Sequence, residues 1–163
     1  MTTVNATVRR KTTAPIGNGD GSNLRNPGVR TIELAPSASG TVVDFKLRIP
    51  SSARIDLASS IMYDDLATSG APTLDLGLYA VDGNITSDDD ALNDGLTLTT
   101  ALTYATRAPV IKDFANAGKQ AWEYVSGVTA DPGGFFDVKG VIRDAATITN
   151  TGSITLDMKL YND

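Results

Sequence analysis

The chain has 163 residues and a formal net charge of −5 at pH 7, and it contains no cysteine and no histidine. This length suits a single domain with its own hydrophobic core. Without cysteine no disulfide framework can form, and without histidine the chain lacks the commonest general base and transition-metal ligand. We therefore expect stability to come from packing or subunit association, and we expect neither an enzyme nor a bound cofactor.

The sequence shows no targeting or membrane segment. No apolar run approaches the ~20 residues that a membrane helix needs. The residues Met1–Asn5 lack the apolar core of a signal peptide. We expect a protein that is made and used in a cytoplasm, or in a particle assembled there, without a membrane partner.

Charge is unevenly distributed along the chain. Residues 1–30 hold five basic residues against Asp20 alone, a balance of +4, so residues 31–163 carry −9. An acidic body does not attract nucleic acid, whose backbone is itself anionic. A basic segment on such a body suits docking onto an acidic protein surface. The candidate docking residues are Arg9, Arg10, Lys11, Arg25 and Arg30.

Residues 1–28 are expected to form an extended N-terminal arm, and residues 29–163 a single domain. The arm is polar, has no sustained apolar period, and is interrupted by two turn-forming clusters, 17–21 and 26–28. A segment of this composition cannot bury enough apolar surface to fold alone. We expect it to become ordered only against a partner.

Beyond the arm, apolar and polar residues alternate with the period of two that indicates half-buried strands. The alternation is clear in four segments, 41–49, 53–63, 73–81 and 154–160. The residues predicted to point into the core are Val43, Phe45, Leu47, Ile49, Ile55, Leu57, Ile61, Tyr63, Leu74, Leu76, Leu78, Ile154, Leu156, Met158 and Leu160.

The segment 96–128 is less clearly patterned, with short strands expected around Leu102, Tyr104 and 110–111 and a helical turn or loop over 115–124. After the turn signal at 131–134, apolar residues predict a further strand that bends at Gly140; they are Phe136, Val138 and Ile142. Seven or eight short strands joined by turns predict an all-β protein, either a β-sandwich or a jelly roll.

One acidic stretch is similar to the start of a calcium loop, because oxygen-bearing side chains recur at alternate positions: Asp82, Asn84, Thr86 and Asp88. The match then fails, since Ser87 stands where the loop needs glycine and Asn93 where it needs a bidentate glutamate. We favour a turn followed by a short helix that Ser87 caps, with residues 88–90 in its first turn and no metal.

Other candidate groups have simpler explanations than catalysis. The pairs Asp64-Asp65 and Ser59-Ser60 have no histidine to work with and no nucleophile elbow around them. Trp122 with Tyr124, and Tyr63 with Tyr79, could form a sugar-stacking platform, although core or interface packing is the commoner role of such residues. A carbohydrate-binding module therefore stays an alternative, and it predicts that Trp122 or Tyr124 is exposed.

Several motifs follow one another in a particular order along the chain. A predicted strand ends in Pro50 and is followed by small residues and Ala53-Arg54-Ile55; next come 64–70, then Leu74-Asp75-Leu76-Gly77-Leu78, and a last predicted strand at 152–161. This order resembles the head decoration, or cement, proteins of tailed bacteriophages, and 152–161 resembles their closing strand. The resemblance covers about residues 40–105 and 135–161, and its individual motifs are degenerate.

This resemblance implies a jelly-roll-like structural protein of the virion. Such a protein binds the outer capsid surface across junctions of the major capsid protein, stabilises the shell, and is expected to be a homotrimer. It needs no catalytic residue, cofactor, nucleic acid or membrane. Another virion role, in the tail or at the head–tail joint, would use the same kind of sandwich and stays open.

Overall fold

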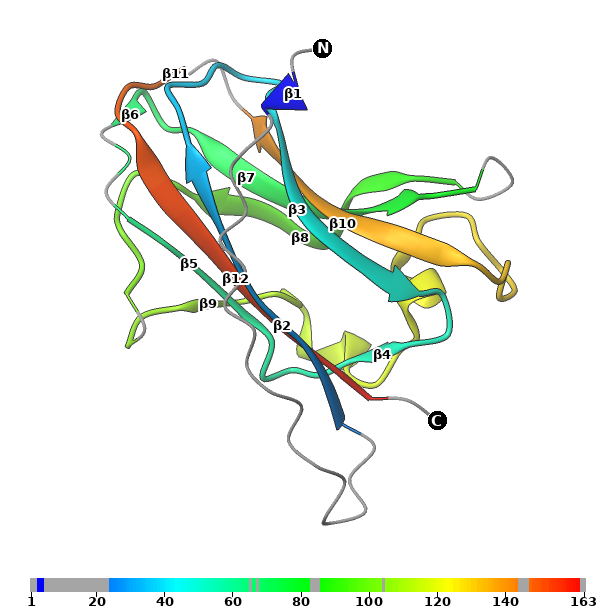
Figure 1. The fold of residues 1–163 in the computed structure, drawn as a ribbon. Coiled ribbons are helices and arrows are strands. Elements are labelled where there is room, and N and C mark those ends of the chain that lie inside the picture. Colours follow the sequence, from blue (N-terminus) through cyan, green and yellow to red (C-terminus); the bar gives the residue numbers. More distant parts are fainter. Residues whose placement is uncertain are drawn as a thin grey trace.

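The computed structural model describes residues 3–4, 24–64, 66, 68–82, 86–103, 105–143 and 147–161. They form two main sheets packed face to face, a small two-stranded sheet of residues 68–69 and 147–148, and two single-turn 3-10 helices at one end (Figure 1). No helix among these residues is long and apolar enough to cross a membrane.

In chain order the elements are β1 (Thr3–Val4), β2 (Leu24–Leu34), β3 (Val42–Pro50), β4 (Arg54–Ile55), β5 (Ser60–Tyr63), β6 (Thr68–Ser69), β7 (Thr73–Ala80), β8 (Asp88–Thr97), β9 (Ala108–Pro109), η1 (Phe114–Asn116), η2 (Ala121–Tyr124), β10 (Phe135–Arg143), β11 (Thr147–Ile148) and β12 (Gly152–Tyr161).

Each sheet takes strands from both halves of the chain. Sheet A has the order β1-β3-β10-β7-β8 and sheet B the order β2-β12-β5-β9, while β4 also pairs with β12. The pairs β2–β12, β3–β10, β5–β9 and β7–β8 are all antiparallel, as if the chain were one long hairpin. Winding such a hairpin into two layers gives the double Greek key of a jelly roll. The predicted jelly-roll-like β-sandwich is confirmed.

The core lies between the two sheets and contains the predicted alternating residues. On β3, Val43, Phe45, Leu47 and Ile49 are at most 2% exposed. The inward residues of β7 and of β12 are buried as well, so the strands predicted over 41–49, 73–81 and 154–160 are confirmed. Burying this much aliphatic surface is the main source of stability in a fold without disulfides.

The strand predicted over 53–63 is interrupted, and in this respect the prediction is wrong. It forms β4 and β5, with a turn between them in which the Asp56 carboxylate accepts a hydrogen bond from the Ala58 amide at 2.9 Å. An aspartate that bonds the backbone two residues ahead favours a turn over a strand. Leu57, at this turn, is only partly buried.

The helix predicted after Ser87 is also wrong, because residues 88–97 form strand β8. The side chain of Ser87 accepts a hydrogen bond from the Ala80 amide of β7 at 3.0 Å and so starts strand pairing instead of capping a helix. The ladder between β7 and β8 slips twice, which lets this polar segment bury Leu92 and Leu96. Tertiary pairing overrides local helix signals here.

Gly77 lets β8 approach β7 closely. A Cβ atom at Gly77 would lie 2.2 Å from the carbonyl oxygen of Asp88 and 2.5 Å from the backbone of Asp89. No side chain fits in that space, so the position requires glycine. β8 thus packs closely against β7 at the border of sheet A.

The segment 96–128 contains less strand than predicted. Leu102 forms an isolated bridge with Tyr63, and the strand β9 precedes the buried residues Val110 and Ile111. Tyr104 lies outside the described residues. The region predicted as a helical turn or a loop contains η1 and η2.

The bend predicted at Gly140 of β10 has no counterpart in a register shift at that residue. The register between β10 and β7 is continuous through Gly140. The irregularity lies instead on β3, where the register shifts opposite Val138 and Lys139 and Lys46 has a φ of 52°. Gly140 serves packing, since a Cβ atom there would lie 2.8 Å from Cδ1 of Leu74.

Candidate functional site

The predicted docking residues do not belong to one arm. Arg9, Arg10 and Lys11 lie outside the described residues, whereas Arg25 and Arg30 belong to strand β2. Arg25 pairs in register with Leu160, and Arg30, which is half-buried, pairs with Leu156. The two arginines are therefore parts of sheet B.

The boundary between the arm and the domain lies earlier than predicted. Strand β2 begins at Leu24, and Leu24, Arg25 and Gly28 pair with β12, so residues 24–28 do not belong to an arm. The ladder extends this far because β12 continues to Tyr161, which lies opposite Leu24. Pro27 is compatible with a strand here because β2 is a border strand of its sheet.

The four candidate calcium ligands are not held as a set in the described part of the chain. Asp82 and Thr86 are exposed, and Asn84 lies outside the described residues. Asp88 opens β8, and its carboxylate accepts a hydrogen bond from the Ser126 amide at 2.8 Å. Burial acts to raise the pKa of Asp88, but hydrogen bonds from Asp90 and from the Ser126 amide outweigh it and lower the pKa. Among the described residues, no three acidic side chains converge on a metal position.

The aromatic residues considered for sugar stacking are engaged in packing. Tyr124 is only 9% exposed, and its hydroxyl donates to the carbonyl oxygen of Asn116 at 2.7 Å. Burial raises the pKa of Tyr124 to about 12. Trp122 is half-buried, and its indole N–H donates to Gln120 at 2.7 Å. The exposed platform that a carbohydrate-binding module would present at these two residues is not found.

The outer face of sheet A carries a network of charged and polar side chains. Arg143 of β10 donates to Asp75 of β7 at 2.8 Å and to Asp89 of β8 at 2.7 Å, and Tyr79 donates to the same Asp89 at 2.6 Å. The ammonium group of Lys139 lies 5.1 Å from the centre of the Tyr79 ring. Burial, and then the hydrogen bond to Asp89, raise the pKa of Tyr79. The network ties three neighbouring strands together.

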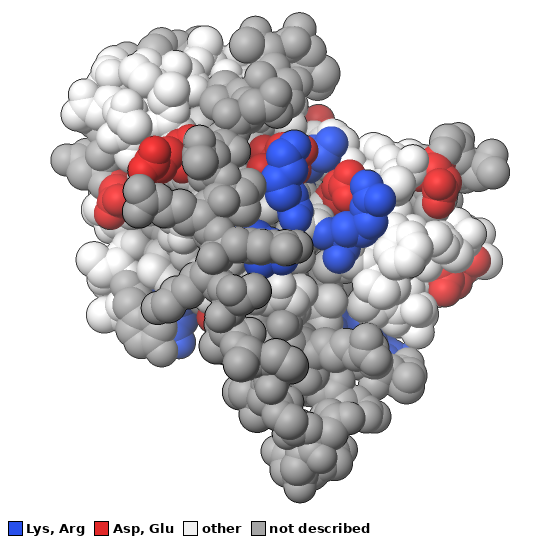
Figure 2. Space-filling model, viewed as in Figure 1, with Lys and Arg blue, Asp and Glu red and all other residues white. Residues whose placement is uncertain are grey.

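A second ion pair extends the mixture of charges across this face. Arg48 of β3 donates to both carboxylate oxygens of Asp137 on β10, at 2.8 and 3.2 Å. Over β3 and β10, Figure 2 shows basic and acidic side chains next to one another. Because basic and acidic side chains alternate here, the described part of this face has no continuous positive potential that would attract nucleic acid.

The border of β8 is closed by hydrogen bonds from other segments. The carbonyl oxygens of Leu92 and Asp94 accept from the backbone N–H (3.2 Å) and the ammonium group (2.6 Å) of Lys112, respectively. The carbonyl oxygen of Thr97 accepts from the hydroxyl of Tyr63. A strand border whose acceptors are already used cannot take up another strand readily.

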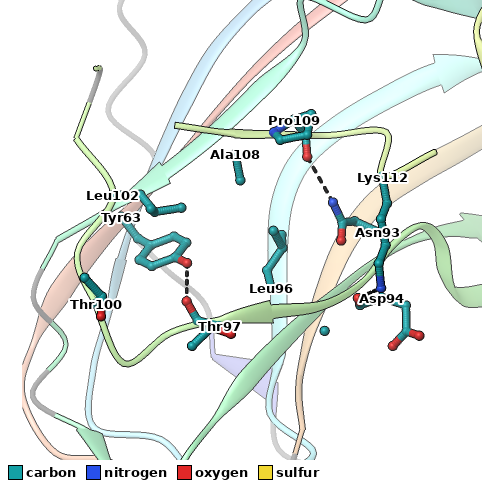
Figure 3. Close-up of a pocket in the computed structure, with 11 residues that line it drawn as sticks. Tyr63, Asn93, Asp94, Leu96, Thr97, Thr100, Leu102, Ala108, Pro109 and Lys112 are labelled. Carbon is teal, nitrogen blue, oxygen red and sulfur yellow. Dashed lines mark hydrogen bonds between the residues drawn. The ribbon is translucent and has the colours of Figure 1, made fainter. Parts of the chain in front are cut away.

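Next to this closed border lies a groove of about 460 Å³ between β8 and β9 (Figure 3). Its walls are mainly apolar and come from both sheets, so it sits at the opening of the sandwich. The side chains of Leu96, Leu102 and Ala108 point into it, and Tyr63 closes one end (Figure 3). Thr100 and Lys112 lie at its rim.

Asn93 supplies a buried polar group at the other end of the groove. It is 5% exposed, and its side-chain nitrogen donates to the carbonyl oxygen of Pro109 at 3.0 Å. This bond fixes the orientation of the amide, because only its nitrogen can donate. The amide oxygen is therefore turned away from Pro109, on the side of the groove (Figure 3), and no described residue donates to it. The sequence pointed to Asn93 only as a poor calcium ligand, since its burial depends on β9 folding over β8.

No protein-family model, curated protein or solved structure shows a significant match to this chain. The similarity to phage capsid decoration proteins thus stays an inference from the order of sequence motifs. The jelly-roll topology rests on the strand pairing described above.

Proposed function

We propose that this chain is a structural virion protein that binds the outside of a tailed-phage capsid. In this role it spans junctions of the major capsid protein and stabilises the shell as a decoration protein. The order of sequence motifs suggests the role, and the jelly-roll sandwich is compatible with it. A fold alone does not establish a function, so the proposal depends on which surfaces the protein offers to other chains.

The observation that carries the proposal is the 11-residue strand β2 at the border of sheet B. It pairs with β12 on one side, and no described strand pairs with its other side. Unpaired N–H and C=O groups along a border strand are a template for pairing with another protein chain. On the same side of the sandwich β1 adds to β3 in parallel, through Thr3 and Val4. This side is therefore suited to backbone-mediated association.

A capsid-binding role has a clear energetic basis. A protein that binds the intact shell and not its separated subunits stabilises the shell by mass action. Many copies on a symmetric lattice act together, so each individual contact can be modest. A rigid sandwich with an associating border meets these needs without any catalytic group.

The proposal is tested by co-sedimentation of the purified protein with expanded and unexpanded capsids of the phage that encodes it. We expect saturable binding to expanded capsids, where the junctions of the mature lattice exist, and weaker binding to unexpanded ones. Absence of binding to both forms would refute the decoration role, and binding only to tails would favour the other virion role.

The N-terminal basic residues have a separate test. Because β2 begins at Leu24, a truncation that removes residues 1–23 leaves every core strand of the sandwich in place. We expect this variant to remain folded and to bind capsids at least tenfold more weakly. The matched control replaces only Arg9, Arg10 and Lys11 with alanine, and it should reproduce most of the loss if charge is the cause. Full capsid binding by the truncated protein would eliminate the docking role.

The proposed homotrimer can be examined by light scattering of the free protein. We expect the mass of three chains at micromolar concentrations. A monomer that persists at high concentration would contradict the trimer, although each copy could still bind the capsid alone.

A further inference from the structure

We propose that the groove between β8 and β9 binds one aromatic side chain with an N–H or O–H donor, presented by a partner protein. A groove of about 460 Å³ lies in the lower part of the range of about 300–1,000 Å³ seen for small-ligand pockets. This volume is large enough to admit one aromatic side chain. The choice of a protein as the source of the ring rests on the proposed capsid-binding function; the preference for a donor-bearing ring does not.

The apolar walls favour an aromatic group over a sugar. Leu96, Leu102 and Ala108 offer a bound molecule contact surface and no hydrogen bond. A sugar ring placed among them would turn several of its hydroxyl groups towards these apolar walls, and a hydroxyl group buried without a partner costs more than its contacts return. An aromatic ring instead gains from each face that it buries against these side chains.

The acceptor of Asn93 requires that the ring carry a donor. In the unbound protein the groove is open to solvent, so water can serve the amide oxygen of Asn93. A ring without a donor would displace this water and leave a buried acceptor unpaired. An indole N–H or a phenol O–H would replace the water and keep the hydrogen bond. Aromatic anchors seated in such pockets commonly dominate protein–protein affinity.

The closed border of β8 restricts how the partner can approach. Because the carbonyl oxygens of Leu92, Asp94 and Thr97 already accept hydrogen bonds, an incoming strand would find these acceptors used. Recognition at this border therefore depends on an inserted side chain and not on a backbone ladder. In this respect the groove differs from the border of β2.

A pair of probe molecules tests the donor directly. Indole and indene have nearly the same shape, but only indole has an N–H. We expect both to shift the amide NMR signals of Gly95 and Lys112 in the full-length protein, with indole binding about 3- to 10-fold more tightly, the value of one net hydrogen bond. Equal binding of the two probes would overturn the donor requirement. Failure of both to bind, or tighter binding of glucose, would overturn the aromatic site.

Substitution at Ala108 tests the location. Its side chain points into the groove (Figure 3), so A108F should fill the space and abolish binding of both probes, whereas A108S should retain it. Circular dichroism of both variants checks that the sandwich is intact. If A108F loses its fold, filling the groove from the rim with T100W provides the second variant. Probe binding that survives in folded groove-filling variants would show that the probes bind elsewhere and would overturn the site.

Capsid binding by the same variants separates this inference from the proposed function. We expect A108F to bind capsids at least tenfold more weakly than A108S. If the probes bind as expected but A108F binds capsids normally, the groove does not receive a side chain of the capsid protein. The assignment of the partner is then overturned, and the decoration role stands. If the unchanged protein binds no capsid, the proposed function fails and the partner assignment fails with it, while the probe result still decides the chemistry of the groove.

Discussion

The two long sides of the sandwich are built differently. On one side β8 and β9 border the two sheets, and side-chain and backbone donors from other segments cover the acceptors of β8. On the other side β2 and β3 are the border strands of the main sandwich, and β1 adds two residues to β3. The first side offers a side-chain-lined groove, and the second offers backbone groups. A sheet protein can thus direct association to one border by closing the other.

The largest effect is expected where β8 lies against β7. We expect Gly77→Ala to destabilise the protein by about 3 kcal/mol, because the new Cβ atom would collide with backbone that cannot move independently of the strand. The midpoint of urea denaturation measures the change. The matched control is Gly140→Ala, whose Cβ atom would meet the flexible end of Leu74, with an expected cost of about 1 kcal/mol. Equal costs would contradict the close approach of β8.

The next effect concerns the network that ties β8 to the rest of sheet A. Arg143→Met should cost about 1–3 kcal/mol, because Asp75, which is 7% exposed, would lose its charged partner and, among the described residues, keep the Gly95 amide as its donor. Arg48→Met is the control, since its ion pair with Asp137 is largely exposed, and we expect little change there. Thermal denaturation of both variants gives the comparison. A larger loss in the control would contradict the structural role of the network.

A smaller effect tests the hydroxyl that closes β8 at Thr97. Tyr63→Phe should cost about 1 kcal/mol, the value of one net hydrogen bond. Burial raises the pKa of Tyr63, so the folded state favours the neutral phenol. Its contribution is therefore complete below the ordinary tyrosine pKa of about 10 and is lost as the pH rises through the higher value of the folded state. Denaturation midpoints from pH 8 to 12 should converge for the two proteins, and parallel curves would contradict this role.

The smallest effect on stability is expected for Lys112→Met. The ammonium group is exposed at the surface, so its loss should change stability by less than about 0.5 kcal/mol. The substitution nevertheless frees the carbonyl oxygen of Asp94 on the border of β8. We expect concentration-dependent self-association in sedimentation velocity, with Lys119→Met as the control. If Lys112→Met does not increase self-association, the hydrogen bond from Lys112 to Asp94 does not protect the border of β8.

Sequence periodicity predicted the strands whose two faces meet different environments. The residues of β3 and β12 alternate because one face is buried and the other is more exposed, and a sequence records that alternation directly. In β7 the apolar residues alternate with Asp75 and Gly77, which are buried as well. Strand β8 was predicted as a helix because its first residues are Asp88, Asp89 and Asp90, which suit a helix amino terminus. Its strand form depends on β7, which no local signal reveals.

The candidate sites were less predictable than the fold. The closing of the β8 border depends on Lys112 and Tyr63, which reach it from distant segments. The groove exists only because β9 and the loop before it return to β8, so the role of Asn93 could not be read from its neighbours in sequence. The predicted boundary at residue 28 failed for the same reason, since the beginning of β2 is fixed by its pairing with β12.

The proposal that this chain stabilises a capsid from outside is tested most directly by heating expanded capsids with and without the bound protein. Light scattering and release of packaged DNA both report the temperature at which the shell fails. We predict a higher failure temperature that saturates when the binding sites on the lattice are filled. An unchanged failure temperature at saturating protein would contradict the decoration role.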